Sequence, residues 1–200
     1  VTVLTGMPNY PDGKIPPQYR GRLFFNEQHN GVQVIRTWFL PASRLASAVV
    51  RGLSALSFGS SSFLRGLFLK KPDLVMSFSP PIFMGNTAHL LSKLWQVPLV
   101  INVKDLFTNS ILAGRLAKPG LVIDLLFGLE KKLYLKADRI ITNASNFRHF
   151  FESLGAAPDR IAVIPDWADG DLIQPGEKDE PIRQEWDLGD RFIVLYSGNF

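Results

Sequence analysis

The chain has 200 residues with a net charge of +4, and 46% of its residues are hydrophobic. This composition is typical of a globular domain with one good core, and the absence of cysteine excludes disulfide bonds, thiolate metal sites and cysteine catalysis and favours a reducing compartment. The mild positive charge permits anionic partners such as nucleotide sugars or lipid phosphates, whereas no Lys/Arg-rich block indicates a nucleic-acid partner.

The start of the chain and its two most apolar stretches do not have the features of targeting or membrane segments. The first five residues lack an initiator Met, a basic region and a cleavage site, so no signal peptide is expected. The apolar stretches 49–58 and 121–129 contain Arg51 and Asp124 and are shorter than the roughly 18 residues that a membrane span needs. We therefore expect no transmembrane helix.

Short apolar runs alternate with helical patterns along the chain, which predicts an α/β fold with a Rossmann-like parallel sheet and flanking helices. The seven predicted strands are residues 1–5, 32–38, 74–78, 99–103, 139–142, 161–164 and 192–196. Several of them are apolar throughout, which is typical of strands buried on both faces. A small hairpin is also predicted between residues 23–28 and 32–38, because Asn30-Gly31 is a strong turn signal.

Helical patterns fill the segments between these strands. The predicted helices are residues 43–69, 82–95, 121–136 and 146–154. Gly59 and the three serines that follow it predict a break that divides the first of these regions into two helices. Gly155 stands where a helix C-terminus favours glycine.

The composition changes after Pro165 and predicts a boundary between domains. Residues 1–174 are expected to form one Rossmann-like domain, and the Pro-, Gly- and charge-rich residues 175–190 are expected to be a solvated linker. Residues 191–200 contain one more strand and too little sequence to form a unit, so they are expected to be the first strand of a second, truncated domain.

Loops that follow three predicted strands carry the candidate site residues. In a parallel sheet the carboxyl ends of the strands line one crevice, so these loops should converge on a common ligand edge. The candidates are Gly6, Tyr10, Ser79, Pro80, Lys104 and Asp105. At such an edge Lys104 is suited to neutralising a phosphate, and Asp105 to orienting a sugar hydroxyl or acting as a structural hydrogen-bond acceptor.

No metal site or standard phosphate loop is expected. The acidic residues near Gly170 miss the spacing of an EF-hand, and the three histidines lie far apart in the sequence. Gly6 and the pair Gly13-Lys14 do not match a phosphate loop, because Ile15 stands where Ser or Thr would bind magnesium.

Several short motifs, taken together, resemble one known family. They are Val-Thr-Val-Leu-Thr at 1–5, Ser-Pro-Pro at 79–81, Asp-Leu-Phe-Thr-Asn-Ser at 105–110, Ala-Asp-Arg-Ile at 137–140, Val-Ile-Pro-Asp-Trp-Ala-Asp at 163–169 and Tyr-Ser-Gly-Asn at 196–199. Their order and spacing resemble the family 4 glycosyltransferases, in the branch that builds bacterial capsule, O-antigen and colanic-acid polysaccharides. Thr108 and Asn109 depart from the pattern, since Pro and Glu are usual there, and many relatives carry His, Arg or Gln in place of Lys104.

The resemblance implies a retaining, two-domain GT-B transferase, of which this chain would be the N-terminal, acceptor-side part. The first strand would precede Val1 and the E-x7-E donor site would follow Phe200, so the chain alone would be inactive. The reaction would transfer a hexose from a nucleotide diphosphate sugar to a glycan or lipid-linked sugar acceptor, with no cofactor and no metal. Lys104 and Asp105 would be the catalytic candidates, and Gly198 and Asn199 would approach the donor diphosphate.

A basic and apolar segment bears on where such an enzyme would work. Its basic residues are Arg44, Arg51, Arg65, Lys70 and Lys71, interleaved with Leu45, Val49, Leu53, Leu56, Phe63, Leu64, Leu67 and Phe68. Such a helix either lies on an anionic membrane or packs in the core with a solvated basic face. A helix that lies on the membrane would suit a lipid-linked acceptor and a cytoplasmic enzyme at the inner face of the cell membrane.

Two other functions remain open alongside the transferase. A sugar-nucleotide 2-epimerase shares the GT-B shape, although the motifs at 79–81 and 163–169 argue against it. A non-catalytic module that binds a nucleotide-sugar-like ligand is the second alternative, and the departure at Thr108 and Asn109 favours it slightly.

Overall fold

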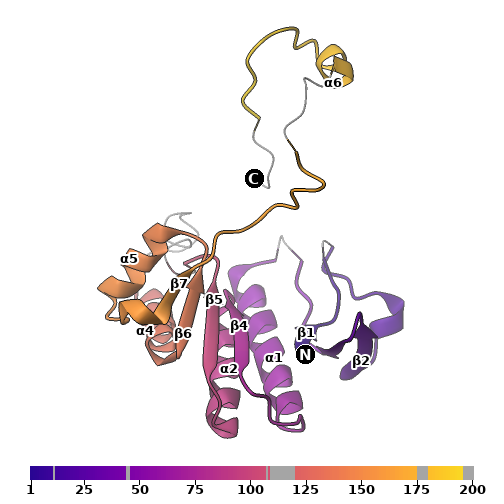
Figure 1. The fold of residues 1–200 in the computed structure, drawn as a ribbon. Coiled ribbons are helices and arrows are strands. Elements are labelled where there is room, and N and C mark those ends of the chain that lie inside the picture. Colours follow the sequence, from indigo (N-terminus) through magenta and orange to yellow (C-terminus); the bar gives the residue numbers. More distant parts are fainter. Residues whose placement is uncertain (11, 44–45, 107, 109–119, 175–179, 196–200) are drawn as a thin grey trace. The chain divides into compact units, whose positions relative to one another are not determined.

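The computed structural model describes residues 1–10, 12–43, 46–106, 108, 120–174 and 180–195 (Figure 1). The chain divides into two units, Val1–Pro165 and Asp166–Phe200. All the predicted site residues that the structure describes belong to the first unit, so that unit is the one that builds the candidate site.

A three-stranded sheet opens the first unit. Strand β1 (Thr2–Gly6) pairs in parallel with β3 (Val32–Thr37), which pairs antiparallel with β2 (Phe24–His29). Asn30 and Gly31 join β2 to β3 with φ angles of 47° and 80°. Positive φ at both positions is the geometry of a tight hairpin turn, and it confirms the hairpin predicted from Asn-Gly.

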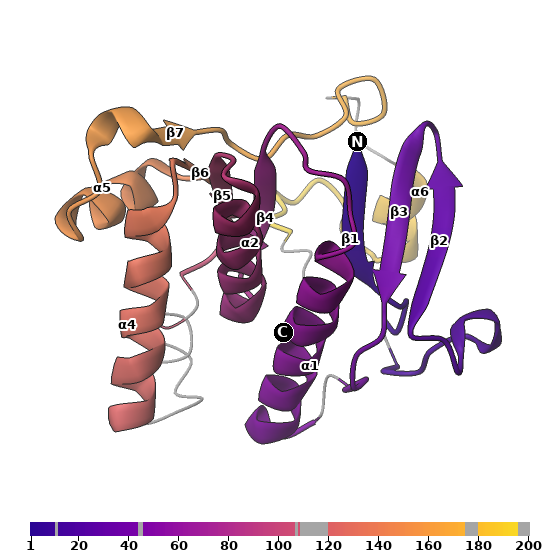
Figure 2. The same cartoon turned by 90° about the horizontal axis from the view of Figure 1, so that it is seen from below.

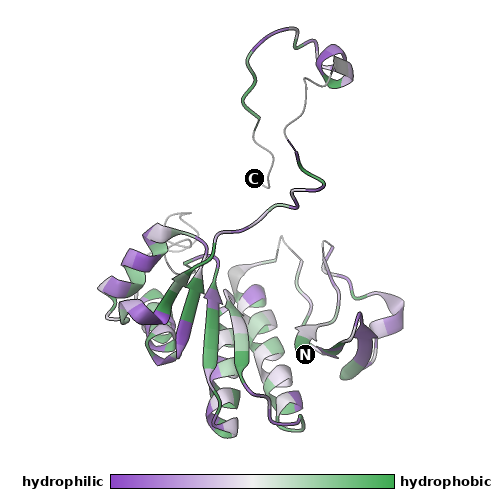
Figure 3. Ribbon diagram, in the orientation of Figure 1, coloured by the Kyte–Doolittle hydropathy of each residue, from purple (hydrophilic) through white to green (hydrophobic). Residues whose placement is uncertain are grey.

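A four-stranded sheet follows, and all of its strands are parallel. Its order is β4-β5-β6-β7, and the strands are β4 (Val75–Ser79), β5 (Leu99–Val103), β6 (Arg139–Thr142) and β7 (Ile161–Val163). Each lies within one residue of its predicted position. Figure 3 shows β4 and β5 as mainly apolar, as expected for strands of a buried parallel sheet.

The helices α1 (Ala48–Gly66), α2 (Ile82–Trp95) and α4 (Leu121–Lys136) lie on one side of the strands, as Figure 2 shows. Helix α5 (Ser145–Ser153) leads into β7, with Gly155 at φ 100° just after its end. Short 3-10 turns occupy Pro17–Tyr19 and Pro158–Arg160. Strands joined by crossover helices in one order confirm the predicted α/β, Rossmann-like class. None of the helices within the described residues is both long and apolar enough to cross a membrane.

The predicted break at Gly59 is wrong, because α1 is one continuous helix from Ala48 to Gly66. Gly59 lies where α1 packs against α2: its carbonyl accepts a hydrogen bond of 3.1 Å from the Thr87 hydroxyl. A Cβ atom at this position would come within 3.1 Å of the Thr87 hydroxyl oxygen and 3.4 Å of the Phe83 carbonyl oxygen. The glycine is therefore explained by close helix packing and not by chain breaking.

One core cluster joins the four-stranded sheet to α2, α4 and α5. Its buried members are Ala88, Leu99, Ile101, Val103, Leu106, Leu133, Tyr134, Ala137, Ile140, Phe151, Ala156 and Ile161. Alternate residues of β5, namely Leu99, Ile101 and Val103, face this cluster. Burial of one face of every strand of this sheet holds the carboxyl ends of the strands at fixed positions.

The second unit differs from the sequence prediction in two respects. Helix α6 (Glu180–Glu185) lies within residues 175–190, which were predicted to be a linker. Residues 192–195 are not a strand, and residues 196–200 lie outside the described part. A single strand gains stability only from partners, and no other strand lies among the described residues of this unit, which explains the wrong prediction. The domain boundaries remain a prediction.

Candidate functional site

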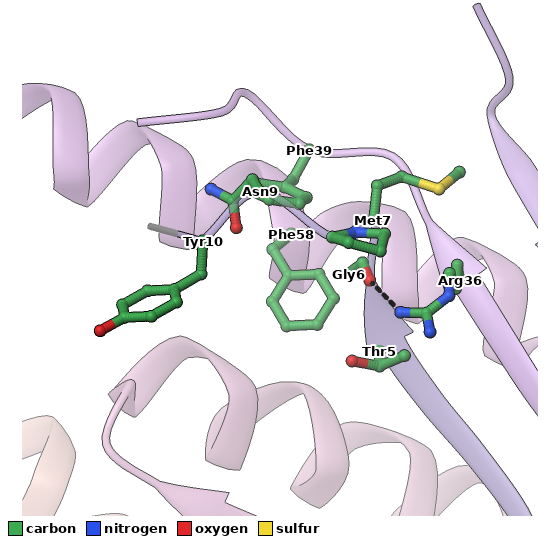
Figure 4. A pocket seen from close by; sticks show the side chains of 9 residues that line it. Thr5, Gly6, Met7, Asn9, Tyr10, Arg36, Phe39 and Phe58 are labelled. Atoms are coloured by element: carbon green, nitrogen blue, oxygen red, sulfur yellow. Dashed lines mark hydrogen bonds between the residues drawn. The ribbon is translucent and has the colours of Figure 1, made fainter. Parts of the chain in front are cut away.

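A pocket of about 370 Å³ lies where β1 ends (Figure 4). Its lining residues are Thr5, Gly6, Met7, Pro8, Asn9, Tyr10, Arg36, Phe39 and Phe58. The loop after β1 therefore forms one wall, while β3 and α1 contribute Arg36 and Phe58. Two of the predicted site residues, Gly6 and Tyr10, are among these residues, and Tyr10 is 73% exposed.

Arg36 ties the end of β1 to the hairpin. Its Nη1 donates a hydrogen bond of 3.2 Å to the Gly6 carbonyl, and its Nε donates one of 2.7 Å to Glu27. The Arg36 guanidinium also lies over the Tyr19 ring, 5.4 Å from its centroid, and the Tyr19 hydroxyl donates to the same Glu27 carboxylate. These contacts fix the carbonyl at the start of the pocket loop, and the half-buried Arg36 guanidinium at the pocket wall is ion-paired with Glu27 at 2.6 Å.

Gly6 lies close to the rings of Phe39 and Phe58 in the pocket wall. A Cβ atom at Gly6 would lie 2.9 Å from the Phe39 ring and 3.6 Å from the Phe58 ring. A larger side chain would therefore displace Phe39, since real Cβ contacts are longer than this distance. The two rings lie 5.8 Å apart and make the apolar floor beside the polar atoms of Arg36 and Asn9.

The second group of predicted residues meets at the ends of β4 and β5. Ser79 and Val103 occupy matching positions of these strands, and the next residue, Lys104, donates its backbone N–H to the Ser79 carbonyl at 3.2 Å. Pro80 follows Ser79 directly, and α2 begins two residues later at Ile82. The structure thus brings Ser79 and Lys104 together as the sequence predicts.

Two buried hydroxyl groups lie at this edge. Ser79 and Thr142 are each aligned with Val103, one on either side of it, and both are almost fully buried. Within the described residues, neither the Ser79 Oγ nor the Thr142 Oγ1 makes a hydrogen bond. Burying a hydroxyl without a hydrogen-bond partner costs free energy. Each of these two hydroxyls can therefore form a hydrogen bond with a ligand or a water molecule at this edge.

A buried carboxylate anchors the segment that follows β5. Glu130 of α4 is only 2% exposed, and its Oε2 accepts hydrogen bonds from the Thr108 hydroxyl at 2.6 Å and the Thr108 backbone N–H at 3.3 Å. The other oxygen, Oε1, accepts a bond of 2.6 Å from the Tyr134 hydroxyl. Thr108 is four residues beyond Lys104, so the network holds the loop that carries Lys104 and Asp105 against α4.

Tyr134 connects this network to Ser79. Burial, followed by the negative charge of Glu130, raises the pKa of the Tyr134 hydroxyl above its ordinary value of 10.0. The Ser79 Oγ lies near enough to act in the opposite direction on this pKa, although no hydrogen bond of normal geometry joins the two side chains. Tyr134 therefore lies close to the end of β4 while its hydroxyl is bound to Glu130.

The raised pKa of Tyr134 predicts a loss of stability at alkaline pH. The pKa of Tyr134 is higher in the folded than in the unfolded chain, so the buried hydroxyl adds its full share of stability below pH 10.0. Above pH 10.0 the unfolded chain releases the Tyr134 proton while the folded chain keeps it, and this share is lost. Denaturant unfolding near neutral pH and above pH 10.0 should show a larger fall in the free energy of unfolding for the wild type than for Tyr134→Phe. Equal falls in the two proteins would contradict this assignment.

The remaining predicted residues are placed as follows. Asp105 is exposed next to the half-buried Lys104, and Gly198 and Asn199 lie outside the described residues. The pocket group with Gly6 and Tyr10 stands on the three-stranded sheet, and the group with Ser79 and Lys104 stands on the four-stranded sheet. The structure therefore places these residues in two groups on two sheets, and their convergence on one ligand edge stays a prediction.

Sequence reasoning missed three residues that organise these groups, namely Arg36, Glu130 and Tyr134. A signal existed for two of them, because Ile123, Glu130 and Tyr134 recur at spacings of seven and four residues on the apolar face of one predicted helix. For Arg36 no such signal existed, since its contact with the Gly6 carbonyl depends on how β1 and β3 pair. Thr108, noted only as a departure from the family pattern, is a central hydrogen-bonding partner.

Metal ligands do not gather in the described part of the chain. Across residues 1–10, 12–43, 46–106, 108, 120–174 and 180–195, no three His, Asp or Glu side chains lie close enough to bind a metal ion. These two groups of residues can recognise a ligand through two cationic side chains, Arg36 and Lys104, through hydroxyl groups and through the exposed Asp105 carboxylate. This combination suits polyhydroxylated or phosphorylated ligands.

Comparison with known proteins gives two matches. The family model described as "Glycosyl transferase 4-like domain" matches residues 1–167. The chain is also 31% identical over 118 residues to a D-inositol 3-phosphate glycosyltransferase of Acidothermus cellulolyticus. That alignment covers 57% of this chain and 25% of the relative, so it spans about a quarter of the relative's length.

Proposed function

Since the chain belongs to the glycosyl transferase 4-like domain family, we propose that it is the acceptor-side part of a retaining GT-B glycosyltransferase. The enzyme transfers a sugar, a hexose or a similar one, from a nucleotide diphosphate sugar to a glycan or lipid-linked precursor of a bacterial polysaccharide. It works in the cytoplasm, at the inner face of the cell membrane. The chain alone is inactive, because the groups that bind the donor diphosphate lie in a second domain.

The observation that carries this proposal is the family match over residues 1–167, which contains both groups of site residues. The similarity to a named glycosyltransferase over 118 residues supports sugar transfer as the reaction class. Further support comes from the chemistry at the ends of β4 and β5, where Lys104 and Asp105 follow a buried strand. A cation next to a carboxylate suits an acceptor that carries both a phosphate and free hydroxyl groups.

On this proposal, the site residues bind the acceptor or hold the segments that bind it. Lys104 binds an anionic group of the acceptor, and Asp105 accepts a hydrogen bond from a sugar hydroxyl. Glu130 and Thr108 act indirectly, because they hold the segment that carries these two residues. The pocket at Gly6 and Arg36 encloses a further part of the acceptor beside the apolar rings of Phe39 and Phe58. No step requires a metal or a cofactor from these residues.

Ligand binding by the 200-residue chain tests the proposal. Saturation-transfer NMR with a panel of sugar phosphates and lipid-linked sugar diphosphates should show binding of an acceptor, and Lys104→Ala should weaken it by roughly tenfold. Lys93→Ala is the matched control, since it removes an exposed lysine from α2. Incubation with nucleotide diphosphate sugars should give no transfer by this chain alone.

Other outcomes identify the alternatives. Conversion of a nucleotide sugar to its C2 epimer would show an epimerase, and binding of nucleotide sugars but no acceptor would favour a non-catalytic module. Retention is tested on the longer enzyme by the anomeric coupling constant of the product. Inversion at the anomeric carbon would overturn the retaining assignment while leaving sugar transfer intact.

A further inference from the structure

The loop that forms one wall of the pocket at the end of β1 is anchored on both sides. The Met7 N–H donates a hydrogen bond of 3.3 Å to the carbonyl of the last residue of β3, and the Gly13 N–H donates one of 2.6 Å to the Asn9 carbonyl. Gly13 has a φ of 71°, and a Cβ atom there would come within 2.7 Å of the Ser43 backbone nitrogen. A ligand therefore meets a pocket wall whose two ends are already held in place.

The pocket lining combines aromatic rings with polar groups. Phe58 of α1 is half-buried, and Figure 4 shows its ring at the centre of the lining side chains. Tyr10 adds a second, largely exposed ring, while Thr5 and Asn9 supply a hydroxyl and an amide. A ligand that fills this pocket therefore meets aromatic rings and hydrogen-bonding groups at the same time.

Among the lining residues that the structure describes, only Arg36 is charged, and Glu27 compensates its charge. The Arg36 Nη2 lies 2.6 Å from the Glu27 Oε1, and the two side chains are 22% and 29% exposed. The contacts with Glu27 and with the Gly6 carbonyl involve the Nε, the Nη1 and the Nη2 of Arg36. A guanidinium has five N–H groups, so Arg36 can still donate hydrogen bonds to a ligand from Nη1 and Nη2.

We propose that this pocket binds an uncharged pyranose ring of the acceptor, and that Glu27 sets the preference for an uncharged ligand. A pyranose presents C–H groups that pack on an aromatic ring, and hydroxyl groups that pair with Thr5, Asn9 and Arg36. A phosphate would meet a cation that Glu27 already compensates, whereas a prenyl chain would desolvate the Asn9 amide without giving it a hydrogen bond. The inference rests on the proposed function, since it names the part of the acceptor that the pocket holds.

Binding of methyl glycosides by the 200-residue chain tests the pyranose assignment. Saturation-transfer NMR compares the methyl glycosides of glucose, galactose, mannose and N-acetylglucosamine, of which one or more should bind with a Kd on the order of 1 mM. Phe58→Leu should weaken this binding by about fivefold. Asn9→Ala should weaken it by about three- to tenfold. The matched controls Phe68→Leu and Asn146→Ala alter exposed residues outside the pocket and should bind like the wild type.

Exchange of Glu27 for glutamine tests the charge preference. The wild type should bind the uronic acid that corresponds to the best glycoside no more tightly than the glycoside itself. Glu27→Gln should bind this uronic acid about three- to tenfold more tightly than the wild type does and leave glycoside binding unchanged. Glutamine keeps the side-chain length and an acceptor oxygen for Arg36, so a purely structural role of Glu27 would not alter which ligand is preferred. Glu152→Gln, which removes the carboxylate of another Arg–Glu pair on α5, is the matched control.

Thermal unfolding by circular dichroism shows whether each variant folds. If Phe58→Leu does not fold, Tyr10→Ala takes its place, because Tyr10 is 73% exposed and its ring lines the same pocket. The pyranose assignment is wrong if no uncharged glycoside binds at about 50 mM, or if the pocket and control variants bind equally. An unchanged ligand preference in Glu27→Gln would contradict the role of Glu27.

Two competitors identify other occupants of the pocket. Displacement of the glycoside by inorganic phosphate would show an anion site, and displacement by geraniol would show an apolar site, and either result would overturn the inference. Binding of lipid-linked sugar diphosphates through Lys104, with no binding of glycosides, would overturn this inference and leave the proposed function standing. Binding of glycosides in the pocket, with no binding of any sugar phosphate or diphosphate, would count against the proposed function alone.

Discussion

Replacing Glu130 by alanine should lower the free energy of unfolding by about 3 to 5 kcal/mol. Among the described residues, the carboxylate accepts three hydrogen bonds from buried groups, two from Thr108 and one from Tyr134. Alanine would leave all three donors without this acceptor, and each unsatisfied buried donor costs about 1 to 3 kcal/mol. The loss should exceed that of an ordinary surface substitution several times over.

Urea denaturation of the wild type and variants measures this effect. Glu130→Gln keeps one acceptor oxygen and should lie between the wild type and Glu130→Ala. Glu152→Ala, which removes a carboxylate paired with Arg148 on the surface of α5, should leave the stability almost unchanged. If Glu130→Ala were as stable as Glu152→Ala, the buried network would contribute nothing to the fold. Loss of acceptor binding in Glu130→Gln with little loss of stability would support its role in positioning Lys104.

The second large effect is expected at Phe151. Phe151→Ala should lower the free energy of unfolding by about 3 to 5 kcal/mol, because the ring is fully buried and its removal leaves a cavity. The ring contacts Tyr134 of α4 edge-on, with centroids 5.0 Å apart, and Phe150 at 5.6 Å. It therefore joins α5 to the helix that carries Glu130.

Two comparisons make the Phe151 measurement specific. Phe68→Ala removes a phenylalanine that is largely exposed and should change the free energy of unfolding by less than about 0.5 kcal/mol. Phe151→Leu keeps much of the volume and should recover more than half of the loss. A small effect of Phe151→Ala would show that α5 is not part of the cooperative core.

Local sequence patterns were sufficient to predict the positions of most strands and helices of the first unit. The apolar runs located β3 to β7, and Asn30-Gly31 located the hairpin, because a turn with positive φ at two positions needs those residues. The segments 82–95 and 121–136 match α2 and α4 at both ends. In the candidate site, the pairing of Ser79 with Lys104 followed from the parallel sheet, since neighbouring strands end at the same edge.

Long-range packing decided the features that local patterns misassigned. Gly59 is a helix breaker by local propensity, yet contact with Thr87 makes it an interior residue of α1. Residues 192–195 have strand composition but no strand partner among the described residues, so propensity alone was insufficient.

By itself, the sequence determined the α/β class, the order of the elements and the positions of Ser79 and Lys104 at the ends of strands. These depend on residues close together in the chain, whose periodicity and turn chemistry are readable. The tertiary structure alone decided that Arg36 holds the Gly6 carbonyl, that Glu130 anchors Thr108 and that α1 directs its leucines outward. Each of these depends on partners distant in the chain, and only the folded arrangement of strands and helices brings such partners within contact.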